Sequence, residues 1–238
     1  MRLSILFAAF VCLAGAIETA RFDSSTVTAS HSDLARLSLH VQYSPQPITL
    51  TSTNTTLKFL LQQAYGLTEH QVSGPAWIKS SRYDISGTLP PDAQSGNVWP
   101  ALQSLLEDRF KLVLQRETKV LPVYVLTATA GGPTLHPAKD PGSKAPVEDR
   151  LEKVSGSLHL DKATMKQFCK ALSRQMDRVV VNETEISGAF QFDLNFESGR
   201  DRSGVAIFSA VQKQLGLKLR PGNRPIETLT VKSAQRTK

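Results

Sequence analysis

Four segments of the chain carry hydrophobic residues three or four positions apart, which is the spacing of an amphipathic helix. Thr55 or Thr56 precedes the first segment, and Gly66 follows it. Pro100 lies near the first turn of the second segment, and Gly216 follows the fourth. The apolar faces defined by this spacing are Leu57, Leu60, Leu61 and Ala64; Leu102, Leu105, Leu106 and Arg109 or Phe110; Met165, Phe168, Cys169, Leu172 and Met176; and Phe208, Val211 and Leu215.

Each predicted helix is followed by two segments with the composition of strands. They are residues 71–72 and 82–86, 111–116 and 120–127, 179–181 and 190–196, and 218–220 and 226–232. The second and fourth pairs predict hairpins, with turns at 117–119 and at Pro221-Gly222-Asn223. Residues 48–51 predict a strand before the first helix, and residues 25–29 predict an edge strand near the start of the chain.

The four helix-strand-strand units occur in the order A-B-A-B, because motifs of the first half recur about 109 residues later. The recurring motifs are Thr56-Leu57-Lys58-Phe59 with Thr164-Met165-Lys166-Gln167, Asp84 with Asp193, and Ala101-Leu102-Gln103 with Ala210-Val211-Gln212. We therefore predict an α+β fold of two similar halves, with helices packed on mainly antiparallel sheets. Residues 46–129 and 155–238 are expected to superpose.

Residues 1–20 have the features of an export signal: Arg2, an uncharged apolar run, and small residues at Ala14-x-Ala16 or Ala20 for cleavage. The alternative is a buried N-terminal helix. We expect a first half at 21–129 with an extra N-terminal strand, a Pro/Gly-rich linker at 130–156, and a second half at 157–238. No other apolar run approaches membrane length, so we expect a soluble mature chain that is periplasmic or extracellular.

The chain is basic, with 28 Lys plus Arg against 21 Asp plus Glu, but its cations are scattered along the sequence. A nucleic-acid-binding surface more often shows a continuous basic stripe with interleaved aromatic residues, so we expect no nucleic-acid partner. An exported basic protein is suited to anionic envelope polymers or lipid headgroups. The alternative is solvated charge that serves no partner.

Residue types that carry chemistry show no catalytic or metal-binding spacing. The five histidines, His31, His40, His70, His136 and His159, form no pair at ligand spacing, and no G-x-S-x-G, P-loop or G-x-G-x-x-G motif occurs. Cys169 lies on an apolar helix face, so we expect it to be buried and unreactive. His159 and Asp161 share one face of a strand, but two ligands do not make a site. We predict no catalytic residue, metal or cofactor, although a dispersed Ser-His-Asp triad stays open.

Two tryptophans are the leading candidates for ligand contact. Trp77 follows Gly74-Pro75 in a loop, and Trp99 directly precedes Pro100. Loop aromatics often anchor ligands, because they offer a large apolar face at low entropic cost. The alternative is that each covers an edge of the core. Arg82 and Arg116 complete the predicted binding residues as cationic groups, although Arg116 with its neighbour Glu117 also suits a local ion pair.

Several motifs together resemble one protein family. They are Gly74-Pro75-Ala76-Trp77-Ile78 with Arg82-Tyr83-Asp84-Ile85, the block from Leu105 to Leu112 with Arg116-Glu117-Thr118 and Leu121-Pro122-Val123-Tyr124, Gly131-Gly132-Pro133, Ser187-Gly188-Ala189-Phe190, and Gln214-Leu215-Gly216-Leu217-Lys218-Leu219. These motifs are similar to those of the soil-associated bacterial protein family, exported proteins of unknown function. The helix-strand-strand pattern also resembles the short N-terminal domain of secretins and TonB-dependent receptors.

The family resemblance implies an extracytoplasmic binding or sensing role, because some family members are joined to membrane metallopeptidase sensors. It transfers no catalytic residue. We therefore expect an exported, non-enzymatic binding or sensing module of the bacterial envelope, with a peptide or an anionic envelope polymer as ligand. The alternative is an envelope hydrolase with a dispersed Ser/His/Asp site.

Overall fold

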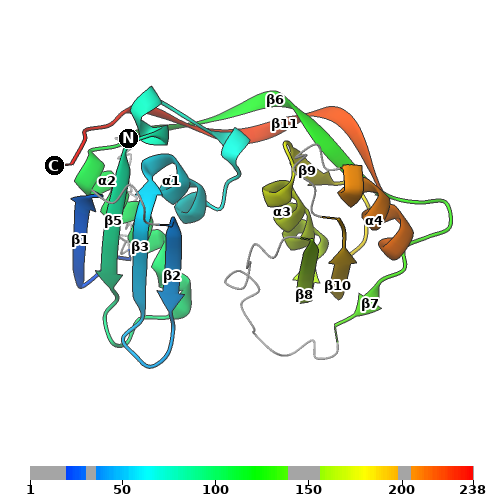
Figure 1. The fold of residues 1–238 in the computed structure, drawn as a ribbon, viewed down its shortest axis with the longest axis horizontal. Helices are drawn as coiled ribbons and strands as arrows, with labels where there is room; N and C mark the ends of the chain where they lie inside the picture. The colour runs from blue at the N-terminus through cyan, green and yellow to red at the C-terminus, as the bar shows by residue number, and fades with distance from the viewer. Residues whose placement is uncertain (1–19, 31–35, 139–155, 198–204, 238) are drawn as a thin grey trace, which may run out of the picture.

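The computed structural model describes residues 20–30, 36–138, 156–197 and 205–237. Helices and strands of these residues form two lobes, and one long two-stranded ribbon runs from lobe to lobe (Figure 1). The ribbon consists of β6 (Val113–Ala128) and β11 (Leu217–Ser233), which pair antiparallel along their lengths. The predicted α+β class with mainly antiparallel sheets is confirmed.

The first lobe combines a four-stranded antiparallel sheet with two helices. Its sheet has the order β1 (Ser24–Ala29), β5 (Arg82–Thr88), β3 (Thr49–Thr56) and β2 (Ser38–Gln42). Its helices are α1 (Leu57–Tyr65) and α2 (Val98–Phe110), with the short turns η1 (Glu69–Gln71), η2 (Ala76–Lys79) and η3 (Ser95–Asn97) between them. The strand predicted at residues 25–29 is present as β1 and lies at the edge of the sheet.

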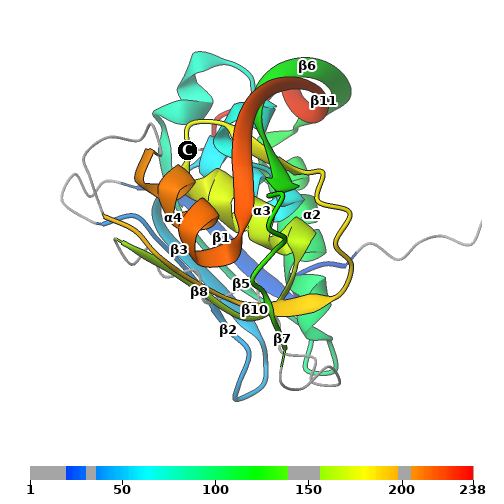
Figure 2. The same ribbon diagram turned by 90° about the vertical axis from the view of Figure 1, so that its right-hand side faces the viewer.

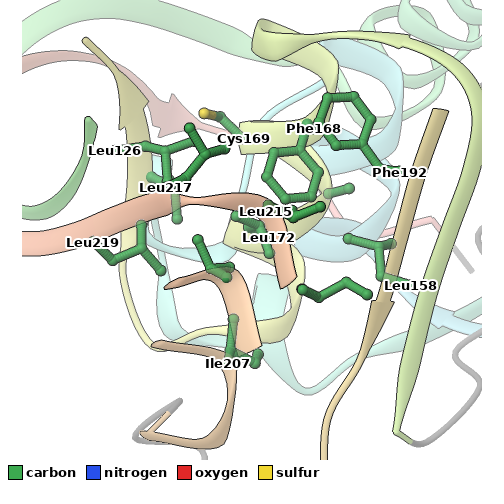
Figure 3. Close-up of a cluster of buried hydrophobic side chains, with 14 of the residues drawn as sticks. Leu126, Leu158, Phe168, Cys169, Leu172, Phe192, Ile207, Leu215, Leu217 and Leu219 are labelled. Carbon is green, nitrogen blue, oxygen red and sulfur yellow. The ribbon is translucent and has the colours of Figure 1, made fainter. Parts of the chain in front are cut away.

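The second lobe is smaller and has a three-stranded sheet. The sheet order is β7 (His136–Pro137), β10 (Ala189–Asn195) and β8 (Ser157–Thr164). Helices α3 (Met165–Gln175) and α4 (Val205–Leu215) complete the lobe, as the view from its side shows (Figure 2). In its core the rings of Phe168 and Phe192 stack with their centres 4.2 Å apart, beside Cys169 and Leu172 (Figure 3).

Local signals in the sequence explain where the helices begin and end. The Thr56 hydroxyl accepts a hydrogen bond from the Phe59 amide (3.2 Å), which caps α1. Gly66 then ends α1 in the left-handed conformation at φ 63°, which glycine adopts without steric cost. Thr164 caps α3 in the same way and forms a capping box with Gln167. The apolar faces predicted for these two helices are buried.

The two predicted hairpins are wrong. Residues 111–127 do not turn at 117–119, and residues 217–233 pass through Pro221-Gly222-Asn223 without a turn. Each segment is one continuous strand, and the two pair with each other. The turn signal at Pro221 misled the prediction because a proline is tolerated in a strand where its nitrogen faces away from the paired neighbour.

Each long strand serves both lobes. Leu229 and Val231 of β11 lie in the core of the first lobe, and Tyr124 and Leu126 of β6 lie in the core of the second. Two short strands extend the ribbon in parallel: β4 (Val72–Ser73) pairs with β11 at the first lobe, and β9 (Val179–Asn182) pairs with β6 at the second. The ribbon therefore ties the lobes together through their cores.

The order strand, helix, short strand, strand, helix, long strand occurs twice along the chain. Superposition of the two halves stays a prediction. The predicted export signal lies outside the described residues except for Ala20, and so does most of the predicted linker. The described start of that linker lies against the second lobe, where β7 pairs with β10. Within the described residues, no helix is both long and apolar enough to cross a membrane.

Candidate functional site

The two predicted tryptophan anchors lie at the border of the first core. Trp77 in η2 and Trp99 in α2 are both partly buried and pack against that core. The Arg236 guanidinium lies over the Trp77 ring, 5.4 Å from its centre. Both tryptophans thus contribute to packing and also keep part of their surface exposed.

The two predicted arginines lie on different strands and have different partners. Arg82, at the start of β5, donates to the Asn54 carbonyl oxygen (2.8 Å). Arg116, on β6, forms an ion pair with Glu227 of β11 (2.6 Å). No hydrogen bond, ion pair or ring contact joins any two of Trp77, Trp99, Arg82 and Arg116, all of which the structure describes. The structure therefore shows no direct contact among these four residues, and their part in binding stays a prediction.

Arg116 belongs to a polar network that connects the ribbon to both helices of the first lobe. Its guanidinium lies 5.5 Å from the centre of the Tyr65 ring in α1. The Tyr65 hydroxyl donates to Glu107 of α2 at 2.5 Å. Burial, together with this hydrogen bond, raises the pKa of Tyr65 above its usual range, so the hydroxyl keeps its proton and remains a donor.

The half of the ribbon nearer the first lobe has an open strand edge on β6. The three prolines of the ribbon pair as Pro122 with Asn223, Pro221 with Tyr124, and Pro225 with Val120. Because proline has no N–H to donate, these pairs are the ones whose backbone groups point away from the partner strand. On β6, the backbone N–H and C=O groups of Leu114, Arg116, Thr118 and Val120 point away from β11 in the same way. Since β9 covers β6 only from Val123 onward, no described strand pairs with this edge.

Exposed apolar side chains mark both ends of this open edge. Val113 is 55% exposed and Val120 is 72% exposed. Together with Leu37, they are the exposed large hydrophobic residues of the described chain. We call residues 113–120 the β6 edge. In Figure 1 β6 starts over the first lobe and runs from there toward the second, and Leu114 packs against the first core.

The charges between the two valines are paired within the ribbon. Glu117 accepts from Lys119 (2.8 Å) and from Lys232 of β11 (3.3 Å). These two hydrogen bonds lower the pKa of Glu117. Because two lysines share one carboxylate, and Arg116 is balanced by Glu227, the β6 edge and its immediate partners carry a small positive excess.

The opposite edge of the ribbon, on β11, is closed to further pairing. Pro221 and Pro225 remove two of its outward N–H groups. The Gln71 side chain donates to the outward carbonyl of Glu227 (2.9 Å), next to the place where β4 pairs. The two edges of the same ribbon therefore differ, and only the β6 edge keeps an unbroken series of backbone donors and acceptors over 113–120.

A second cluster of ionisable groups lies on the exposed face of the second sheet. His159 of β8 and Asp193 of β10 are directly opposite each other, and the ring Nδ1 contacts the Asp193 carboxylate. The ring Nε2 contacts Asp161 at 2.7 Å. These bonds, first the one to Asp193, raise the pKa of His159. Both ring nitrogens face carboxylates, so neither is directed at a serine.

The remaining chemical candidates are structural. Cys169 is 3% exposed, and burial raises its pKa to about 12, so the prediction of a buried thiol is confirmed. Asp84, the counterpart of Asp193, accepts a hydrogen bond from the Asn54 amide (2.7 Å). Among the described residues, no three His, Cys, Asp or Glu side chains are grouped to hold a metal ion.

A family model described as "Protein of unknown function (DUF3738)" matches residues 58–234. The chain belongs to the DUF3738 family. No curated protein matches the chain, and no solved structure matches it. The DUF3738 region begins within α1 and ends just after β11. It therefore includes both strands of the ribbon and the β6 edge.

The sequence of this DUF3738 chain pointed to Arg116 as a candidate binding residue, but it did not predict the β6 edge. The reason is that the predicted turn at 117–119 divided the edge into two short strands. Thr118 and Val120 lie four and two residues before Pro122. Residues two apart in a strand point the same way, so both share the outward orientation of Pro122. That information can be used only once the pairing of β6 with β11 is known.

Proposed function

We propose that this protein is an exported, non-enzymatic binding module of the bacterial cell envelope that recognises another polypeptide. The observation that supports the proposal is the β6 edge: a strand edge with free backbone groups and an exposed valine at each end. Unpaired strand edges are strong sites of association, and natural proteins usually block them. The opposite edge on β11 is blocked by prolines, whereas the β6 edge is not.

The basic balance of the chain supports an envelope location, where anionic polymers and headgroups are the common partners. The predicted export signal supports the same location. An anionic envelope polymer stays the second candidate ligand, since cations are spread over both lobes.

The alternative, a hydrolase with a dispersed triad, has His159 as its best candidate base. In a working triad the histidine contacts a nucleophile on one side and a carboxylate on the other. Here carboxylates occupy both sides of an exposed ring. This arrangement supports a surface ion-pair cluster more than a catalytic base.

One experiment with two assays distinguishes a binding function from a hydrolytic one. Extended peptides selected from a displayed library, and a set of peptidoglycan fragments, are tested for saturable binding by calorimetry. Ester and peptide substrates are tested separately for turnover. We expect saturable peptide binding without turnover, and we expect Val120→Asp to weaken it because a charge replaces an apolar contact. Turnover that His159→Ala abolishes would overturn the proposed function.

The same experiment tests the tryptophan site. Trp77→Ala is compared with Val120→Asp, after circular dichroism has shown that both variants fold. If the peptide contacts the β6 edge, Val120→Asp reduces affinity and Trp77→Ala does not. If Trp77 is the anchor, its removal costs about 1–3 kcal/mol of binding free energy and Val120→Asp has no effect.

A further inference from the structure

The β6 edge has the geometry to take up one more strand. Leu114, Arg116, Thr118 and Val120 alternate along it with their N–H and C=O groups directed away from β11. An incoming extended segment bonds such a row of groups as a sheet neighbour does, and this main-chain pairing is a common mode of peptide recognition. Antiparallel pairing suits it, because opposite residues then exchange both hydrogen bonds.

We propose that the β6 edge binds an extended, acidic peptide segment of another protein by antiparallel strand addition. This inference rests on the proposed binding function and names the partner's chemistry. The edge reads, from 113 to 120, apolar, apolar, polar, basic, acidic, polar, basic, apolar. A matching segment has apolar residues opposite Val113 and Val120 and carboxylates opposite Arg116 and Lys119. Cross-strand pairs of these types stabilise a sheet by about 0.2–1 kcal/mol each.

The charges on the ribbon favour an acidic segment. Glu117 already shares its carboxylate between Lys119 and Lys232, so a carboxylate on the incoming strand meets lysine that is not fully neutralised. Arg116 keeps three-fifths of its side chain exposed beside Glu227, with relative exposure of 60%. This exposure leaves the guanidinium accessible to a second acidic group.

A second copy of this chain is a poorer occupant than an acidic segment. Antiparallel pairing of two identical edges must place outward residues opposite outward residues. If the two-fold axis of such a dimer passes through Arg116, the arginines of the two copies lie opposite each other. If it passes through Glu117, the two carboxylates lie opposite each other. Like charges directly opposite each other destabilise a sheet. A pair centred on Thr118 sets Leu114 opposite Pro122, which has no N–H and ends the ladder.

Other strand edges of the molecule do not carry the same inference. The edges of β1, β2 and β8 adjoin residues 31–35 or 139–155, which lie outside the described residues. The outer edge of β7 is only two residues long. The β6 edge is flanked on both sides by described residues.

The test uses a fluorescent peptide, blocked at both ends, of sequence Val-Glu-Thr-Thr-Glu-Thr-Val-Val. Placed antiparallel, it sets its first valine opposite Val120 and its two glutamates opposite Lys119 and Arg116. Binding is measured by fluorescence anisotropy on the full protein. A peptide of the same composition with the glutamates at its ends is the control for pattern, and we expect it to bind at least about tenfold more weakly, since two ion pairs and two apolar pairs are lost.

Two substitutions separate the β6 edge from the rest of the ribbon. Thr118→Pro removes one outward N–H from the centre of the edge, and we expect it to weaken peptide binding by about tenfold. Asn223→Pro makes the same change on the β11 edge, between two existing prolines, and we expect the dissociation constant to stay unchanged. Circular dichroism confirms that both variants fold.

N-methylated peptides test the same hydrogen bonds with the protein unaltered, so an unfolded Thr118→Pro variant does not end the test. Methylation of the third and fifth residues blocks the N–H groups that face β6 and abolishes binding. Methylation of the second and fourth residues blocks those that face solvent and has little effect. On binding, the amides of Arg116, Thr118 and Val120 gain protection from hydrogen exchange.

The outcomes distinguish this inference from the proposed function. If other peptides bind but both methylation patterns and both proline variants leave binding unchanged, strand addition is wrong and the binding function stands. If the three amides become protected with rising protein concentration and no peptide, the occupant is a second copy. If no peptide binds and a substrate is turned over, both proposals fail.

Discussion

At the residue scale, side-chain environment decides which ionisable groups are available for chemistry. Cys169 lies in the second core, with apolar neighbours and no described partner that would stabilise a thiolate. His159 lies on an exposed sheet face between two carboxylates. The first environment disfavours the charged form of its side chain, and the second favours it.

Cys169 is expected to resist thiol reagents in the native protein. In a Cys12→Ser background it is the remaining cysteine of the chain, so labelling at neutral pH reports on it alone. We expect labelling only after denaturation, because the thiol is buried and its pKa is about 12. Cys169→Ala should lower the free energy of unfolding by about 1–2 kcal/mol through lost packing. Rapid labelling of the folded protein would show that the core opens.

His159 is expected to titrate above its usual range in NMR spectra, and Asp193→Asn should lower its pKa more than Asp161→Asn does. Because the folded pKa is raised above the unfolded value of about 6.5, the stabilisation is complete below that pH and is lost as pH rises through the folded pKa. The cluster is exposed, so its size is about 0–1 kcal/mol. A His159 pKa unchanged by Asp193→Asn would contradict the cluster.

At the element scale, local sequence determined the helices and long-range pairing determined the ribbon. The caps at Thr56 and Thr164 and the stop at Gly66 are short-range signals, so these helix boundaries could be predicted. The continuity of β6 and β11 depends on residues about 100 positions apart, and no local pattern contains it. The β6 edge follows from this pairing, so it could not be predicted either, whereas Arg116 could be proposed as a candidate from its charge alone.

The two threonine caps provide an element-scale prediction. Thr56→Ala and Thr164→Ala should each lower the free energy of unfolding by about 0.5–2 kcal/mol, because each leaves a helix N–H without its acceptor. Thr→Ser at the same positions keeps the hydroxyl and serves as the control. Urea denaturation measures both. An alanine variant as stable as its serine control would mean that the cap contributes nothing.

At the scale of the whole molecule, exchange of long strands links the cores of the two lobes. Leu229 belongs to the second half of the chain, after α4. Its side chain nevertheless lies in the core of the first lobe, where it is 1% exposed. Tyr124 makes the reverse connection, and its ring meets Phe208 of α4 edge to face at 4.8 Å. Neither core is complete without a strand from the other half of the chain.

Leu229→Ala is expected to destabilise both lobes together by about 2–5 kcal/mol, as for a large side chain removed from a core. Both tryptophans of the chain lie in the first lobe, so their fluorescence reports that lobe, while circular dichroism reports the whole. The two unfolding curves should coincide. Val120→Ala, at an exposed site, is the control and should change stability by less than about 0.5 kcal/mol. An earlier fluorescence transition would mean that the lobes unfold separately.

Hydrogen exchange of single amides along the free ribbon tests the central claim most directly: one continuous ribbon with an open β6 edge. The amides of Gln115, Glu117 and Lys119 face β11 and should exchange slowly, while those of Arg116 and Thr118 should exchange fast. Fast exchange at all five positions would indicate a turn at 117–119 and would contradict the continuous ribbon. Slow exchange at all five would mean that the β6 edge is already covered, and the proposed binding surface would not exist.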